Sequence, residues 1–385
     1  MVVDYKLKAE DELLLSCARS KLEKEDEAKI ISILDNNLDW EHILDMATRH
    51  RLLPLLYINL NAVSPSKVPV DVLRYLKTNF HDNARRNLLL TGELIKVMQL
   101  LEDNGVKAVT YKGPVLAYSA YGNVGYRQFR DIDLFIEKSD VDKAKNIMNS
   151  NGYYLDPPIE VDNSTYMKLD SEYRFKNTSG VLIELNWNFE GPYFSFKSDS
   201  NRLFSDLIFN RINNFEIRTP SAENEFLMMC IHCAKHNWNR LLWIMDLGEV
   251  LEKKDFNWQK VMKISEELGV KRILIINLIL IQDFRGSQIP AEIKINSDNP
   301  AKEIALQIKN RIFNIDENSL NLIGKFFLDL KKRDSFQIGM KDCIYGLSKP
   351  TSDEYKFLQL PKFLFPLYIF IRPFLLMRKY GKGQI

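Results

Sequence analysis

The sequence has 385 residues, of which 45% are hydrophobic and 27% are charged, and its formal net charge is +2. The length fits about two or three domains, and the apolar share is large enough for a sizeable core. The balanced charge excludes a global attraction to nucleic acid, so that any polyanion site has to be local.

The cysteines and the N-terminal residues bear on cellular location. Cys17, Cys230, Cys233 and Cys343 are irregularly spaced, which favours reduced thiols. The N-terminal sequence MVVDYKLKAEDELLL has no apolar core of the signal-peptide type. Because no segment reaches the ~18 consecutive apolar residues typical of a membrane span, we predict a cytoplasmic protein with no transmembrane segment.

Residues 1–105 are predicted to form an N-terminal helical region. Apolar residues recur at three- and four-residue spacing in DELLLSCARSKL, DEAKIISILDNN, LDWEHILDMATRHRLLPLLYINL, VDVLRYLKTNF and LLLTGELIKVMQLLEDNG. Pro54 breaks this pattern, and Gly105 is suited to end the last helix.

Residues 106–195 have the pattern of a small α/β core. The β-type run VKAVTYKG leads into PVLAYSAYG, a helix with Pro114 in its first turn, and DIDLFIE alternates like a strand. After the amphipathic helix DVDKAKNIMNSNGY, the turn TSG joins EYRFKN to VLIELNWNF, which predicts a hairpin. Residues 196–355 form a predicted C-terminal helical region, and residues 356–385 form an apolar tail. The predicted fold class is therefore α+β, with a small mixed sheet between two helical regions.

Asp131 and Asp133 are the strongest candidates for a chemical site. Residues two apart in a strand face the same side, and two neighbouring carboxylates near a core are costly unless a cation neutralises them. Glu184 joins them if its strand pairs with DIDLF. Three carboxylates on adjacent strands are suited to hold two Mg²⁺ ions, with Mn²⁺ as the alternative metal. The other interpretation is that these are surface residues of an edge strand.

Four residues near the aspartates are candidates for phosphate contacts. Gly113 lies between a short strand and a helix, where the backbone can approach a phosphate closely, and Lys112 adds a positive charge. The alternative for both is an ordinary strand-to-helix turn. Of Arg127 and Arg130, one is expected to pair with the aspartates and the other to bind a triphosphate, with Arg127 the first choice for phosphate.

These motifs together resemble the polymerase-β-like nucleotidyltransferase superfamily, in which a glycine-containing turn and helix precede D-x-D and a later strand carries a third acidic residue. The closest resemblance is to its uncharacterised nucleotidyltransferase family, and it extends to DWEHILDMATRHRLLPLLYINL and ENEFLMMCIHCAKHNWNRLLWIMDLGEVL. It implies a mixed-sheet nucleotidyltransferase core. It also implies that Asp131, Asp133 and Glu184 are metal ligands. Lys112, Gly113 and Arg127 match the nucleotide-facing pattern, although the superfamily usually has Gly-Ser at the first two positions.

His232 and His236 are four residues apart and share one helix face, and Asp246 follows further along the chain. Three interpretations stay open: a contact with the acceptor or nucleotide, a metal site that uses both histidines, or structural packing in which Asp246 or Arg240 bonds to a histidine. Cys230 and Cys233 form C-x-x-C, but no second cysteine pair follows, so we expect buried free thiols.

The resemblance and the carboxylates predict a metal-dependent nucleotidyltransferase. It would transfer NMP from an NTP such as ATP to an acceptor hydroxyl or phosphate and release pyrophosphate. A small molecule, a peptide or a glycan precursor is favoured as acceptor over nucleic acid, because no basic surplus is present. The alternatives are a kinase that uses the same Mg–NTP site, a nucleotide-binding scaffold without catalysis, and a toxin that acts on tRNA. The apolar tail is expected to dock on the protein itself or on a protein partner, with membrane contact ranked third.

Overall fold

The computed structural model describes residues 6–159, 161–189, 194, 202, 204–253, 255–290, 293, 298–314, 322–348, 350, 352–368, 370–372 and 374. The predicted apolar tail is therefore covered only in part, and the remainder of that prediction lies outside the described residues. The fold is α+β, as the sequence predicted, with a small mixed sheet and a two-stranded sheet among helices.

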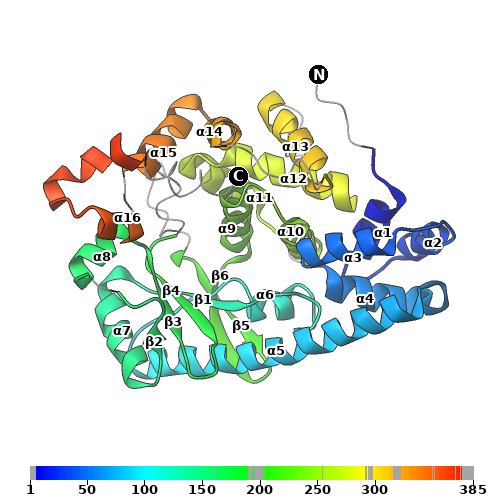
Figure 1. Ribbon diagram of the computed structural model, residues 1–385, viewed down its shortest axis with the longest axis horizontal. Helices are drawn as coiled ribbons and strands as arrows, with labels where there is room; N and C mark the ends of the chain where they lie inside the picture. Colours follow the sequence, from blue (N-terminus) through cyan, green and yellow to red (C-terminus); the bar gives the residue numbers. More distant parts are fainter. Residues whose placement is uncertain are drawn as a thin grey trace.

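The N-terminal region consists of helices and one short 3-10 turn. They are α1 (Ala9–Cys17), α2 (Lys24–Ile33), α3 (Trp40–Arg49), α4 (Leu53–Val63), η1 (Pro65–Lys67) and α5 (Val70–Asp103). The last two apolar patterns of this region form one 34-residue helix, α5, because no proline or left-handed glycine separates them. Figure 1 shows α5 running from the N-terminal helices along the full width of the sheets.

The main sheet has four strands in the order β1-β4-β3-β2. The strands are β1 (Asp131–Phe135), β2 (Tyr154–Leu155), β3 (Glu172–Lys176) and β4 (Leu182–Asn186). β1 and β4 are parallel, whereas β3 is antiparallel to both β4 and β2. The predicted hairpin is therefore confirmed, and so is the pairing of the Glu184 strand with the aspartate strand. The predicted strand VKAVTYKG is wrong in extent, because only Val109 bridges to Phe135.

One face of this sheet is packed against helices. The apolar residues of β1 and β4 alternate with the carboxylates and lie in one hydrophobic cluster with residues of α5 and of α7 (Val141–Ser150). The strand residues in that cluster are Ile132, Leu134, Ile183 and Leu185. This burial fixes the register, because a slip by one residue would turn the carboxylates into the core. The remaining elements of the core are α6 (Pro114–Ser119), η2 (Lys138–Asp140) and α8 (Asn163–Leu169).

The C-terminal region begins with a β-hairpin that the sequence analysis did not predict. It comprises β5 (Leu207–Ile212) and β6 (Phe215–Pro220). The turn residue Asn213 has φ +54°, and the Asn-Asn pair at the turn was a readable signal. The helices that follow are α9 (Ala222–Lys235), α10 (Leu241–Lys253), α11 (Trp258–Leu268), α12 (Lys271–Arg285), α13 (Asn299–Ile312), α14 (Leu322–Lys331) and α15 (Phe336–Ser348).

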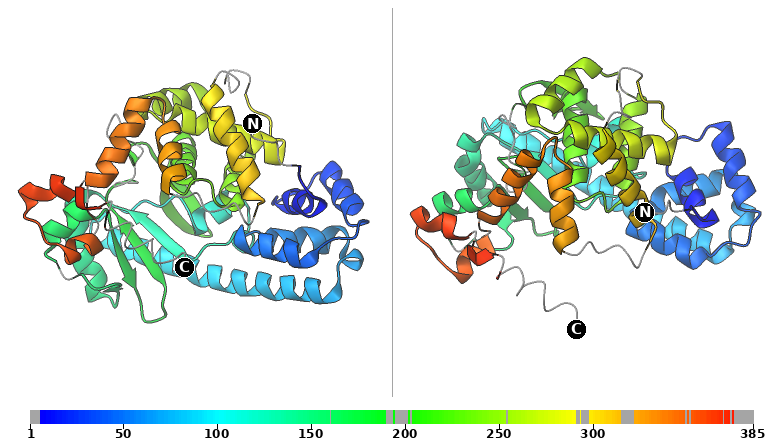
Figure 2. Two further views of the ribbon diagram at one scale, coloured as in Figure 1. Left: turned by 45° about the horizontal axis from the view of Figure 1, so that its top comes forward. Right: turned by 90° about the horizontal axis from the view of Figure 1, so that it is seen from above.

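The two helical regions share one hydrophobic cluster although the core separates them in the sequence. Figures 1 and 2 show α1–α4 beside α12 and α13. Leu13 and Leu14 of α1 lie in the same cluster as Ile276 and Ile281 of α12. The N- and C-terminal helices therefore form a common helical layer.

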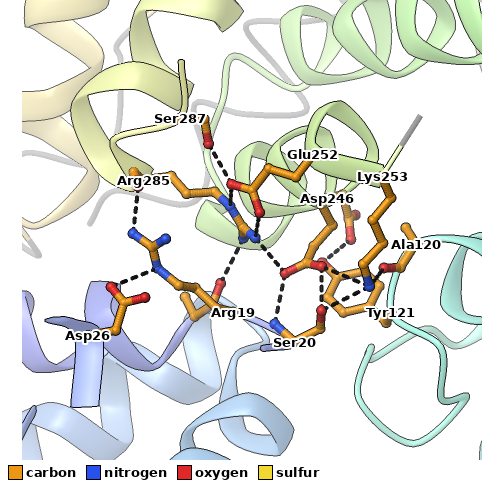
Figure 3. A network of polar contacts seen from close by, with 12 residues as sticks. Arg19, Ser20, Asp26, Ala120, Tyr121, Asp246, Glu252, Lys253, Arg285 and Ser287 are labelled. Carbon is orange, nitrogen blue, oxygen red and sulfur yellow. Dashed lines mark hydrogen bonds and ion pairs between the residues drawn. The ribbon is translucent and has the colours of Figure 1, made fainter. Parts of the chain in front are cut away.

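A buried ion-pair network reinforces this layer (Figure 3). Arg285 of α12 donates to Glu249 at 2.8 Å and to both carboxylate oxygens of Glu252 at 2.7 Å. Glu249 also accepts from the backbone N–H of Ser20 at 2.8 Å, and the Arg19 side chain donates to the Arg285 carbonyl at 2.5 Å. The segment between α1 and α2 is thereby tied to α10 and α12.

The described part of the tail folds on itself and on the protein. It contains the 3-10 helix η5 (Lys362–Leu367) and follows α16 (Ser352–Phe357), and both elements lie beside α8 in Figures 1 and 2. Arg372 pairs with Glu354 at 3.0 Å, and the Tyr368 hydroxyl donates to the Leu358 carbonyl. Several phenylalanines stay exposed, so binding of a protein partner stays a prediction. None of the helices in the described ranges is long and apolar enough to cross a membrane.

We predict that Gly248→Ala destabilises the protein by ~3 kcal/mol in urea denaturation. A Cβ at Gly248 would lie 2.4 Å from Cδ of Arg285, and Arg285 cannot move without weakening its buried ion pair with Glu249. Gly92→Ala, in α5, is the matched control. A Cβ there meets no atom within 4 Å, so the exchange should stabilise the helix by up to ~1 kcal/mol. Equal stability of the two variants would contradict this packing.

Candidate active site

A pocket of about 610 Å³ brings the core and both helical regions together. Most of the residues predicted from the sequence line it: Lys112, Gly113, Arg127, Asp131, Asp133, Glu184, His232 and His236. Arg130 and Asp246 are not among the lining residues. The lining residues that were not predicted as parts of the site include Arg51, Arg240 and Trp243.

The three predicted carboxylates lie on one face of the sheet. Asp133 is directly opposite Glu184 in the parallel register of β1 and β4, and Asp131 is two residues before Asp133 on the same side. Burial and the charge of Asp133 raise the pKa of Asp131 above its ordinary value. The same two causes, with further repulsion from Glu172, raise the pKa of Glu184 to about 8. The carboxylates therefore repel one another in a poorly solvated place.

Two cations partly neutralise this acidic face. Nζ of Lys112 lies 3.3 Å from Oδ1 of Asp133, and Nε of Arg174 lies 3.4 Å from Oε1 of Glu184. From the sequence, Arg127 or Arg130 was expected to pair with the aspartates, but in the structure Lys112 occupies that position. Gly113, the next residue, has φ +61° and is buried, a backbone conformation that favours glycine.

The donor set suits a hard divalent cation, since carboxylate oxygens are the ligands that Mg²⁺ prefers. Yet no group of three or more His, Cys, Asp and Glu side chains in the described parts of the chain is placed to hold a metal ion by itself. Mg²⁺ often binds through one or two carboxylates and completes its shell with water and substrate phosphates. Asp131, Asp133 and Glu184 fit that incomplete kind of site.

Arg127 has a structural partner that the sequence did not reveal. Its Nε donates to Oδ1 of Asp246 at 2.9 Å, and its Nη2 donates to Oδ2 at 2.8 Å. The Tyr121 hydroxyl donates to the same Oδ1 at 2.7 Å. Arg127 and Asp246 are both buried, so the pair fixes the segment before β1 against α10. That Arg127 also contacts phosphate stays a prediction.

Two asparagines of α5 hold the backbone of the same segment. The Asn87 side chain donates to the carbonyls of Val124 and Arg127, each at 2.7 Å. Asn83 donates to the Gly125 carbonyl at 2.9 Å. Sequence analysis missed both residues. A feature of the sequence that could have identified them is the spacing of two asparagines, which are poor helix formers, four positions apart on one face of the long helix.

The rings of His232 and His236 pack against the ring of Trp243 at the pocket, and this group is called the aromatic wall below. The ring centroids of the two histidines are 4.6 Å apart and lie 5.1 Å and 4.9 Å from the ring of Trp243, with His232 the farther one. Asp246 is occupied by Arg127 and Tyr121 behind this wall. The interpretation of His232 and His236 as metal ligands stays a prediction. Cys230 and Cys233 are buried free thiols, as predicted.

His50 is a further residue that sequence analysis missed. It is fully buried, and its Nδ1 accepts from the backbone N–H of Leu241 at 3.1 Å. Its Nε2 lies 3.0 Å from the Ile312 carbonyl, which assigns the proton to Nε2. Burial, followed by the charge of Arg49, lowers the pKa of His50 from its ordinary value to about 4. The neutral ring thus joins the end of α3 to the start of α10.

Comparison with known proteins gave one family. The model of a family described as an uncharacterised nucleotidyltransferase matches residues 36–286, which run from before α3 to the residue after α12. This range includes the whole main sheet and the pocket residues named above. No curated protein and no solved structure gives a significant match to the chain.

We predict that His50 makes the protein less stable as the pH falls from about 6.5 to about 4. Its folded-state pKa of about 4 lies below the ordinary 6.5, so the unfolded chain binds one more proton in that window. The full difference is on the order of 3 kcal/mol. Urea denaturation of wild type and His50→Gln across this range measures it.

His50→Gln is the control because glutamine cannot titrate. Groups such as Glu184, whose pKa is raised, change stability in the opposite direction, so the difference between the two proteins isolates the histidine. Parallel stability curves for wild type and variant would contradict the assignment.

Proposed function

The chain belongs to the uncharacterised nucleotidyltransferase family, and on that premise we propose a metal-dependent transfer of NMP from an NTP to an acceptor hydroxyl or phosphate, with release of pyrophosphate. One observation carries the finer part of this proposal. Asp133 and Glu184 stand opposite each other on parallel strands, beside Asp131, in a pocket with cationic walls. This is where a metal–triphosphate complex would relieve the repulsion among the carboxylates.

Asp131, Asp133 and Glu184 are the proposed metal ligands. Bound Mg²⁺ would supply charge neutralisation at the triphosphate and would make the attacking oxygen a better nucleophile. The chain's own contribution is to hold the reacting groups in place and to keep charged groups preorganised in a poorly solvated pocket. Lys112, at the edge of the carboxylates, is placed to meet a phosphate as a point charge.

The proposed step is attack by an acceptor oxygen on the α-phosphorus. The new bond joins that oxygen to the α-phosphorus, and the bond to the α,β-bridging oxygen breaks, so that pyrophosphate leaves. When the acceptor is a hydroxyl, its proton passes to the carboxylate of Glu184. A bound metal would offset the burial and repulsion that raise the pKa of Glu184, and the ionised carboxylate would then be able to accept this proton.

ATP labelled at either the α- or the γ-phosphate tests the reaction. With Mg²⁺ and with water as the simplest acceptor, we expect AMP and pyrophosphate as products. Asp131→Asn/Asp133→Asn should lower this rate by about 10²–10³-fold. Glu216→Gln is the matched control, because Glu216 is an exposed residue of β6 that pairs with Arg211. It should leave the rate unchanged.

The same assay separates the competing interpretations. Formation of ADP and inorganic phosphate would indicate a kinase-type transfer and would contradict nucleotidyl transfer. Mg–ATP binding that needs the aspartates but gives no turnover with water or with small hydroxyl compounds would favour a scaffold. The assay can then be repeated with glycan precursors and peptides, which we propose as acceptors in preference to nucleic acid.

A further inference from the structure

Three arginines from different regions of the chain meet beside Asp131. Arg51 follows α3, Arg130 directly precedes β1, and Arg240 directly precedes α10. Arg51 and Arg240 line the pocket, whereas Arg130 is exposed and stands in the chain between two lining residues, Phe129 and Asp131. Arg51 and Arg240 each have Arg130 and Asp131 among their electrostatic neighbours, so the three arginines act on the Asp131 end of the carboxylate row.

The backbone positions of two of these arginines are fixed by a buried contact. Arg51 follows His50 in the chain and Arg240 precedes Leu241, and the Leu241 N–H donates to Nδ1 of His50 at 3.1 Å. The opposite ring nitrogen of His50 contacts the Ile312 carbonyl. The two arginines therefore extend from one rigid joint between α3, α10 and α13.

Arg51 also occupies an unfavourable backbone conformation. Its φ is +60°, and it stands just past the end of α3, where glycine is the usual residue. The Leu52 N–H closes the helix by donating to the Ala47 carbonyl at 2.8 Å. A long cationic side chain at a position that favours glycine needs a reason, and its place in the pocket wall supplies one.

The cluster has no carboxylate partner. No described acidic residue lies within ion-pair distance of Arg51, Arg130 or Arg240, whereas Arg127 is fully paired with Asp246. Burial, then repulsion from Arg240 and Arg130, lowers the pKa of Arg51 to about 10. Burial and Arg130 likewise lower the pKa of Arg240. Asp131 offsets part of this repulsion, because its charge raises the pKa of both Arg51 and Arg240, and the cluster of three arginines keeps an excess of positive charge.

The opposite end of the pocket has a different charge. Glu184 lies there with Glu172 and Asp170, and Arg174 pairs with the two glutamates at 3.4 Å and 2.8 Å. A chain of phosphates would be repelled by these carboxylates and attracted by the three arginines. The two ends of the carboxylate row are therefore suited to different parts of the reaction.

We propose that Arg51, Arg130 and Arg240 bind the β- and γ-phosphates of the NTP and hold the departing pyrophosphate. This proposal rests on the proposed function, since it assigns one end of that site. The acceptor then enters from the Glu184 end, where its proton is taken up. Because Arg51 and Arg240 belong to the helical layer, the polyphosphate is bound by the helices as well as by the core.

Calorimetric titration with sodium pyrophosphate, without metal, tests the subsite independently of turnover. We expect Arg51→Gly and Arg240→Gln each to weaken binding by about tenfold or more. Arg85→Gln should leave it unchanged, because Arg85 is an exposed residue of α5 that pairs with Asp82. Asp131→Asn/Asp133→Asn, which disables the proposed metal site, should bind pyrophosphate as tightly as wild type or more tightly.

The melting temperature of the Arg51→Gly variant shows whether a loss of pyrophosphate binding is caused by misfolding. Glycine suits φ +60°, so the melting temperature should be unchanged or higher while pyrophosphate affinity falls. ATP should compete with pyrophosphate. The proposed subsite would be overturned if Arg51→Gly and Arg240→Gln bound pyrophosphate as tightly as wild type. It would also be overturned if saturating ATP did not displace pyrophosphate. Loss of binding in both variants, combined with a wild type that forms no AMP, would support the subsite and count against the proposed function.

Discussion

The buried ion pair between Arg127 and Asp246 is the constraint on which the site depends. Two hydrogen bonds of 2.9 Å and 2.8 Å join the segment before β1 to α10, while Asn87 of α5 holds the Arg127 carbonyl at 2.7 Å. Removing one partner of such a pair would leave a buried charge, which costs about 3–5 kcal/mol. The pair therefore sets where the aspartate strand stands relative to the helices that complete the pocket.

Because of that placement, the two ends of the pocket carry different charged groups. Arg51 and Arg240 stand at the Asp131 end, and Glu184 stands at the other end with its pKa raised. In the proposed reaction, negative charge collects on the leaving pyrophosphate while a proton leaves the acceptor, and the two ends match these two changes. In this proposal the helical layer takes part in phosphate binding, because His50 holds the backbone beside both arginines in place.

The sequence predicted those parts of the site that depend on local pattern. Alternation in DIDLF placed the two aspartates on one face of a strand, and the turn before VLIELNW predicted the hairpin that carries Glu184; the pairing of these two strands was only a condition, which the structure meets. The family match confirms the resemblance. Arg51 and His50 could not be predicted, because their positions arise from packing between helices distant in the sequence. Asp246 was noticed, but its buried partner Arg127 was assigned to phosphate. The run around Val109 resembled a strand, yet only one bridge forms, to Phe135.

The most direct test of the central claim is a crystal structure with Mn²⁺ and an ATP analogue whose α,β-bridge cannot be cleaved. We expect an anomalous manganese signal at the carboxylates of Asp131 and Asp133, and we expect the β- and γ-phosphates beside Arg51 and Arg240. A nucleotide bound elsewhere, or a metal that contacts neither aspartate, would contradict both the proposed catalytic site and its division into a phosphate end and an acceptor end.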